Sequence, residues 1–177
     1  MTDRPSHRPT SALARALAAA LVVALVPALA AVGCGGEAAT STSERQEEVA
    51  RRGAAVMPFD LDATTHHFEP VDDGLVETVV AEDPADSEQV RLVRRHLAGE
   101  AERFARGDFA DPAVIHGDGM PGLAELRAGA ARIAVTYREV PAGGRITFRT
   151  ADPDLVAALH RWGEAQVADH GHHATAH

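Results

Sequence analysis

The chain of 177 residues carries a net charge of −9, and all seventeen of its basic residues are Arg. Nucleic acids and anionic lipid surfaces are bound by basic protein surfaces, so this charge argues against both as partners of the folded part. Because the sequence has no Lys, it also excludes Schiff-base chemistry and a phosphate-binding loop that depends on a lysine.

The first 33 residues have the layout of a secretory signal peptide. Three Arg residues precede an uncharged apolar run at residues 16–32, which Pro27 interrupts. A run of about 17 apolar residues is short for a membrane-spanning helix, so we favour a cleaved leader over an uncleaved anchor. The removed segment holds three Arg and one Asp, which leaves a net charge of −11 on the mature chain.

The end of this leader, Ala31-Val32-Gly33-Cys34-Gly35, resembles the lipobox of bacterial lipoproteins. The resemblance implies that Cys34 becomes the lipidated first residue of the mature chain, anchored in the bilayer on the extracytoplasmic face of the cell membrane. As the single cysteine of the sequence, Cys34 cannot form an internal disulfide or a cysteine-based metal cluster, and a buried free thiol is the alternative. Residues 34–56, rich in Ser, Thr and charged side chains, are predicted to form a flexible spacer.

Residues 57–171 are predicted to form a single α+β domain, since about 115 residues suit one hydrophobic core. In the first half, β-branched and alternating residues over 64–69 and 75–81 predict two strands joined by a tight turn. Asp83-Pro84 has the sequence of a helix start, with Asp as the N-cap. This helix is predicted to end near Gly107.

The second half repeats the same order of elements. After a short helical piece at 123–131, alternation over 133–139 and 146–150 predicts two strands around the turn Pro141–Gly144. Asp152-Pro153 then begins the last helix. The domain is thus predicted as tandem ββα-ββα, a four-stranded antiparallel sheet with two main helices on one face.

The connection between the two halves, Gly107–Gly122, combines Asp, Pro, Gly, His and Met. It is predicted to be the longest irregular passage of the domain. Long structured loops inside compact domains are uncommon and often functional, so this connection is the first place to look for a site.

Imidazole and thioether groups form the main candidate site. His116 and Met120 lie four residues apart on the Gly-rich connection, where both could face one ion. His96 and Glu100 share a helix face on which the carboxylate could orient the imidazole, and His160 is a further candidate ligand. In an oxidising extracytoplasmic location, imidazole and thioether without thiolate suit copper better than zinc. The alternative is a surface-loop His and a core-filling Met without metal.

The other histidines have simpler interpretations. One residue of the pair His66-His67 could join the candidate site. His170 ends the last helix, where a cation is favourable at the negative end of the helix dipole. Residues 172–177 are interpreted as a His-rich disordered tail. For catalysis, His116 with Asp118 could serve as a general base, but turn formation also explains the Asp, and we assign no catalytic residue.

Short motifs spread over the whole domain carry a family resemblance. They are Met57-Pro58-Phe59-Asp60-Leu61-Asp62, Gly107-Asp108-Phe109, Asp111-Pro112, His116-Gly117, Met120-Pro121-Gly122 and Trp162 to His170. Through these motifs the chain resembles a small, uncharacterised bacterial family in which some members carry the name aspartate carbamoyltransferase. The resemblance implies that the central connection belongs to the family pattern.

That name implies carbamoyl transfer, which the sequence disfavours. The chain is too short for the two-domain fold of that enzyme, lacks its Ser-Thr-Arg-Thr phosphate-binding motif and has no Lys to complete such a site. The leading hypothesis is a non-enzymatic, lipid-anchored binding module outside the membrane with a copper-type site. The competing hypotheses are a structural, small-molecule or protein interaction domain without metal and, least favoured, a carbamoyltransferase.

Overall fold

The computed structural model describes the backbone of residues 35–176 and the side chains of residues 41–176. The predicted signal peptide and Cys34 lie outside these described residues. Within this range, none of the helices combines the length and the apolar character needed to cross a bilayer.

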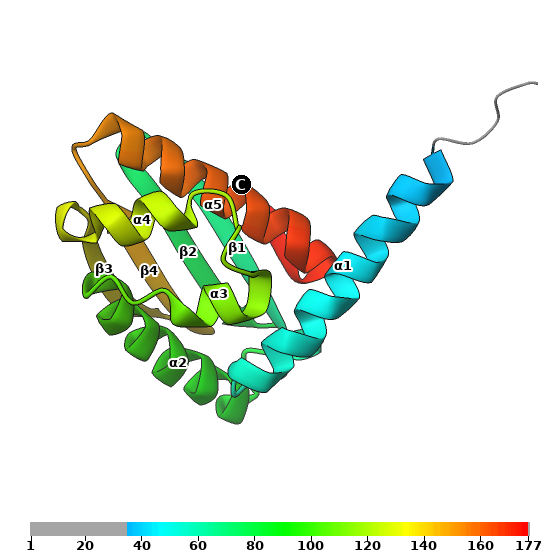
Figure 1. Cartoon of the computed structure of the whole chain (residues 1–177). Helices are drawn as coiled ribbons and strands as arrows, with labels where there is room; N and C mark the ends of the chain where they lie inside the picture. The colour runs from blue at the N-terminus through cyan, green and yellow to red at the C-terminus, as the bar shows by residue number, and fades with distance from the viewer. Residues whose placement is uncertain (1–34, 177) are drawn as a thin grey trace, which may run out of the picture. The chain divides into compact units, whose positions relative to one another are not determined.

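One mixed sheet forms the base of the fold (Figure 1). Its strands are β1 (Thr64–Val71), β2 (Gly74–Ala81), β3 (Ala134–Val140), β4 (Gly143–Arg149) and β5 (Ala174–Ala176), in the spatial order β3-β4-β2-β1-β5. Strands β1 to β4 pair antiparallel, which confirms the α+β class and the predicted core of the sheet. The predicted four-stranded antiparallel sheet differs in detail from the observed five-stranded mixed sheet, because β5 pairs with the free edge of β1 in a parallel direction.

The helices gather on one face of this sheet (Figure 1). The described α-helices are α1 (Gly35–Val56), α2 (Ser87–Ala105), α3 (Ala110–His116), α4 (Leu123–Gly129) and α5 (Pro153–His170), with short 3-10 turns η1 (Leu61–Ala63), η2 (Ala130–Arg132) and η3 (Gly171–His173). The two main helices of the prediction are α2 and α5, and α3 and α4 fill the space between them (Figure 1).

The starts of the two main helices follow from their Asp residues. Asp152 caps α5 as predicted, accepting hydrogen bonds from the next backbone amides, and Pro153 occupies the first turn. The predicted start of α2 at Asp83-Pro84 is wrong. The Asp83 carboxylate accepts from the backbone of Ala85 and closes a local turn, and Asp86 is the residue that caps α2.

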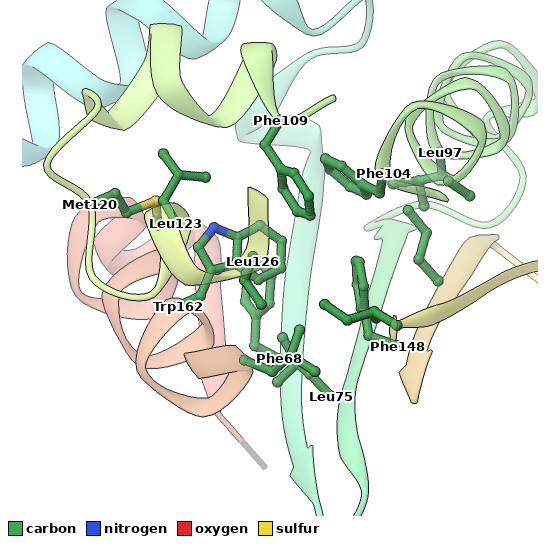
Figure 2. Close-up of a cluster of buried hydrophobic side chains, with 14 of the residues drawn as sticks. Phe68, Leu75, Leu97, Phe104, Phe109, Met120, Leu123, Leu126, Phe148 and Trp162 are labelled. Carbon is green, nitrogen blue, oxygen red and sulfur yellow. The ribbon is translucent and has the colours of Figure 1, made fainter. Parts of the chain in front are cut away.

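Trp162 on α5 ties the two main helices to the sheet (Figure 2). Its fully buried ring lies 6.0 Å from Phe104 on α2, 6.3 Å from Phe68 on β1 and 5.6 Å from Phe148 on β4, measured between ring centroids. All three contacts are close to perpendicular, the arrangement that the charge distribution of aromatic rings favours. This apolar cluster fixes α2 and α5 against one another beside the site described below.

Residues 34–56 differ from the flexible spacer that their composition predicts, because Gly35–Val56 forms α1. The helix is amphipathic and packs on α5: Val49 is fully buried, and Gln46 donates a hydrogen bond to a backbone carbonyl of α5 at 2.9 Å. Ion pairs from Glu48 to the Arg side chains three and four residues later support the exposed face. Most of the charged residues that indicate a spacer are thus on the solvent side of a packed helix, whereas Arg45 faces α5 and pairs with Asp169.

The central connection is also more regular than predicted. Seven of its residues form α3, whose Pro112 lies in the first turn, where a missing N–H leaves no hydrogen bond unmade. Gly117 (φ 90°) ends α3, and Gly122 (φ 80°) precedes α4. A Cβ on Gly122 would come within 2.2 Å of the Ala158 carbonyl oxygen, so glycine there allows the connection to lie directly on α5.

The C-terminal residues form η3 and β5 instead of a disordered tail. Gly171 has a positive φ of 56°, which favours glycine, and turns the chain from the end of α5 toward the edge of β1. There Ala174 is buried, and the Thr175 hydroxyl lies 2.7 Å from His67 Nδ1. Pairing with β1 therefore orders a segment whose own sequence indicates no structure.

Candidate functional site

A polar cavity of about 40 Å³ lies between the sheet and the helices. This volume has room for an ion or a few water molecules, whereas pockets for drug-sized ligands usually measure roughly 300–1,000 Å³. Its polar lining consists of four histidines, three carboxylic acids and one amide, namely His66, His96, His116, His170, Glu77, Glu100, Asp111 and Gln166. Met57 contributes a thioether to the same wall.

The alternation of β1 places one member of its histidine pair inside. Thr64, His66 and Phe68 are buried, whereas Thr65 and His67 between them are partly exposed. Since successive side chains of a strand point to opposite faces, His66 is on the helix-covered face with Phe68.

Two helix ends meet at His66. His116 is the last residue of α3 and His170 is the last residue of α5. The His170 ring centroid lies 5.0 Å from that of His116 and 5.2 Å from that of His66, so the three imidazoles form one contiguous group. Both helices present their C-terminal ends here, and the partial negative charge at a helix C-terminus favours a cation.

His116 is held by an ion pair that joins α1 to α5. Its Nδ1 lies 2.8 Å from Asp169 Oδ2, and Arg45 Nε donates to Asp169 Oδ1 at 2.9 Å. Arg45 also donates to the backbone carbonyl of His116 at 2.8 Å. An ionised carboxylate accepts only, so Nδ1 carries the proton in this pair, and Nε2 of the neutral ring keeps its lone pair beside the side chain of Gln166, a second neighbour that raises the pKa of His116. Carboxylates orient metal-binding histidines in the same way.

Burial keeps all four cavity histidines neutral. It lowers the pKa of His66 to about 3, with smaller contributions from nearby His96 and His173, and lowers the pKa of His96 to about 4. Burial also lowers the pKa of His170 well below its ordinary value, and it lowers the pKa of His116 against the opposing effect of Asp169. Neutral imidazole is the form that binds metal ions.

The carboxylic acids of the cavity differ in charge. Burial raises the pKa of Glu77 to about 7, so that a substantial fraction of this group is protonated at neutral pH. Glu100 and Asp111 both pair with Arg103. Burial raises the pKa of Asp169, but the hydrogen bonds from Arg45 and His116 outweigh it, and the net shift is downward.

Besides Glu100 Oε1, which is ion-paired with Arg103, three buried polar atoms of the lining make no hydrogen bond within the described part of the chain: His66 Nδ1, Trp162 Nε1 and Gln166 Oε1. Leaving such a group unpaired costs about 1–3 kcal/mol, so each one calls for an explanation such as a bound ligand. Two of these atoms, on His66 and Gln166, can accept or bind a positively charged partner in the neutral state of the cavity.

The structure brings together part of the predicted site. His96, His116 and Glu100 all line the cavity, although the Glu100 carboxylate pairs with Arg103 and is not directed at an imidazole by any described contact. A general-base pairing of His116 with Asp118, which the sequence allows but which we do not assign, is absent from the structure, because Asp118 is exposed and pairs with Arg127 at 2.8 Å.

Two predicted ligands lie elsewhere. Met120 is in the apolar core beside Leu123 (Figure 2). His160 Nε2 lies 3.0 Å from the carbonyl oxygen of Val71 and 2.9 Å from that of Gly74, where it ties α5 to the β1-β2 turn. It precedes His170 by ten residues, which is roughly 15 Å along a helix. Neither residue lines the cavity that contains His116.

The sequence does not predict most of the polar residues that line the cavity. From the sequence, His170 is interpreted as a helix cap and His66 only as one member of a pair. Glu77, Gln166 and Met57 have no predicted role in the site. The alternation of β1 identifies His66 as the inward member. The convergence of His170 with His116 depends on how α3 and α5 pack, for which the sequence gives no local signal.

A second group of donors lies at the surface. Within the described residues, a single trio of His, Asp or Glu ligands has donor atoms all within 4.8 Å of one another, and it is Asp62, His172 and His173. The donor atoms of the cavity histidines are farther apart than this. An ion held by three cavity groups therefore requires the imidazole rings to leave these orientations.

Comparison of the chain with protein-family models, with curated proteins and with solved structures gives no match.

Proposed function

We propose that this protein is a binding module for a transition-metal ion, copper, which it holds in the polar cavity through His66, His116 and His170, with Met57 as a fourth, weaker ligand. The observation that carries the proposal is the contiguity of three neutral, buried imidazoles around a space of ionic size.

Ring separation supports a shared ion. With metal-to-nitrogen bonds near 2.0–2.1 Å, two imidazoles on one tetrahedral ion have centroids about 5 Å apart. The centroids of His66 and His116 lie 5.2 and 5.0 Å from that of His170. Since the His66 and His170 rings lie nearly parallel, with 7° between their planes, at least one of them has to rotate for their nitrogens to meet at one ion.

The chemistry of the donors favours copper over zinc. Imidazole suits both metals, but a thioether is a soft ligand that selects copper, and the lining contains Met57 and no thiolate. The helix ends at His116 and His170 add partial negative charge beside a cavity with few ionised groups. A bound cation also lowers the pKa of Glu77, so copper binding releases protons near neutral pH.

Location is part of the same proposal. Lipidation at Cys34 would place the module on the extracytoplasmic face of the membrane, with α1 as the link between the lipid and the domain. Incorporation of radiolabelled palmitate tests this. The wild-type protein is expected to take up label and the Cys34→Ala variant to take up none; label that survives in the variant contradicts lipidation at this residue.

Calorimetric titration of the full-length protein tests copper binding, with Cu(II) in air and with Cu(I) under anaerobic reducing conditions. The surface trio is first inactivated by Asp62→Asn and His172→Asn, two exposed positions, because removing residues 172–177 would also remove β5. In that background His116→Asn keeps a donor for the Asp169 carboxylate and loses Nε2.

Copper affinity is expected to fall at least 10-fold in His116→Asn, since even partners of a ligand change metal affinity by roughly 10–100-fold. The matched control is His160→Gln, which keeps a donor for the hairpin carbonyls and is expected to bind copper as tightly as its parent. Equal affinity of the parent and His116→Asn would refute the copper site. Circular dichroism verifies that each variant is folded.

A further inference from the structure

The surface trio defines a second metal site, separate from the cavity. We infer that Asp62, His172 and His173 bind a zinc-like divalent ion that fastens the C-terminal strand to the sheet. This inference does not rest on the proposed copper site, since none of its three ligands lines the cavity.

The ligands already converge. Asp62 Oδ1 lies 2.7 Å from His173 Nε2, and the rings of His172 and His173 are 3.8 Å apart between centroids. Neighbouring side chains on a 3-10 helix normally point about 120° apart. Their rings nevertheless meet on the side of η3 that faces Asp62, which gives the three donor atoms their mutual distances of less than 4.8 Å.

The donor types match zinc. Two imidazoles and one carboxylate form a ligand set found in zinc sites, with water at the fourth position. Here the water has access, because Asp62 and His172 are exposed, whereas His173 is buried against the domain and fixes one ligand in place. No thioether or thiolate lies among the three ligands, so the set lacks the soft donors that favour copper in the cavity.

The position of the trio gives the ion a structural role. Asp62 is on η1, directly before β1, and the two histidines are on η3, directly before β5. The two strands pair over three positions, His66 with Ala174 to Phe68 with Ala176, which is a short ladder. An ion across η1 and η3 clamps this ladder at its first residue pair, next to the cavity residue His66.

Metal binding should therefore suppress opening of β5. A ligand that binds the closed form alone stabilises it by RT ln(1 + [L]/Kd), so zinc at 100 times its Kd slows amide exchange through such openings by up to roughly 100-fold. The amides of residues 174–176 report this effect directly. Amides in the middle of β4, which β2 and β1 separate from β5, serve as the internal reference.

The experiment uses full-length protein and zinc chloride, with affinity measured against a chromophoric chelator and amide exchange measured by NMR. Asp62→Asn retains an acceptor for His173, and His172→Asn is at an exposed position, so both variants are expected to fold. Each should bind zinc at least 10-fold more weakly, by comparison with the roughly 10–100-fold losses caused by altering mere partners of a ligand. His160→Gln should leave the affinity unchanged.

The cavity variant His116→Asn distinguishes this site from the copper proposal. Zinc affinity and slowed exchange at residues 174–176 should both persist in it, whichever way the copper titration turns out. Zinc affinity that is equal in wild type, Asp62→Asn and His172→Asn would overturn the site. Tight binding at the trio without slower exchange at 174–176 would overturn its clamping role.

Discussion

Glu77 is an acid that the fold keeps largely neutral, and replacing it with Gln should stabilise the protein at alkaline pH. Its side chain is buried on the helix-covered face of β2, and burial raises its pKa from 4.5 to about 7. Gln has the same shape and no ionisable proton. The substitution therefore removes the cost of ionisation and leaves the packing in place.

The sign and size of the stability change follow from the raised pKa of Glu77. Glu77 ionises more easily in the unfolded chain, so it opposes folding once the pH rises above about 4.5, and the effect levels off above about pH 7. A difference of about 2.5 pKa units corresponds to about 3 kcal/mol, at 1.36 kcal/mol per unit. Between pH 5 and pH 8 the advantage of Glu77→Gln over wild type should grow by about 2–3 kcal/mol.

Urea denaturation followed by circular dichroism at several pH values measures this difference. Both proteins also lose stability as the pH falls below about 6.5, because His66 and His96 have folded-state pKa values of about 3 and 4, and taking the difference between variants cancels that effect. Glu164→Gln, an exposed change on α5, is the control. A Glu77→Gln advantage that is the same at pH 5 and pH 8 would refute the argument that burial keeps this acid protonated.

Three further substitutions test other parts of the account. Asp169→Asn removes the carboxylate that raises the pKa of His116, so this pKa should fall further in an NMR titration, and an upward shift would contradict the pairing. Trp162→Ala should lower the free energy of unfolding by about 3–5 kcal/mol in urea denaturation, because it empties the centre of the core, and a loss under 1 kcal/mol would refute that role. Gly122→Ala should lower the free energy of unfolding by more than about 1 kcal/mol, since it combines a positive φ with a clash against α5. A Cβ at Gly119 meets no atom within 4 Å, so Gly119→Ala should leave this free energy almost unchanged. Equal effects of the two substitutions would contradict the close approach of Gly122 to α5.

The antiparallel core of the sheet could be predicted because its signals are local. Alternation and turn residues place β1 to β4 within a few residues of their true bounds, and the Asp152-Pro153 pair gives the start of α5 correctly. The elements α1 and β5 could not be predicted in this way. The first is stabilised by packing on α5 and the second by pairing with β1, and neither contact has a signature in its own segment.

The candidate site likewise combines residues that have a local signal in the sequence with residues that are brought together only by the packed fold. The predicted ligands His96 and His116 both line the cavity, their binding of a metal stays a prediction, and the inward position of His66 follows from strand alternation. The link from Arg45 to Asp169 spans 124 residues, and the link from Asp169 to His116 spans 53. Contacts of that separation depend on the packed fold, so the sequence alone does not indicate Asp169 as the partner of His116.

Anomalous diffraction from crystals of the copper-loaded, full-length protein tests the central claim most directly. At the copper absorption edge, the account predicts a peak in the cavity, with the nitrogens of His66, His116 and His170 at about 2.0–2.1 Å from it. A cavity without a peak, with copper found at the surface trio alone or nowhere, would contradict the proposed function.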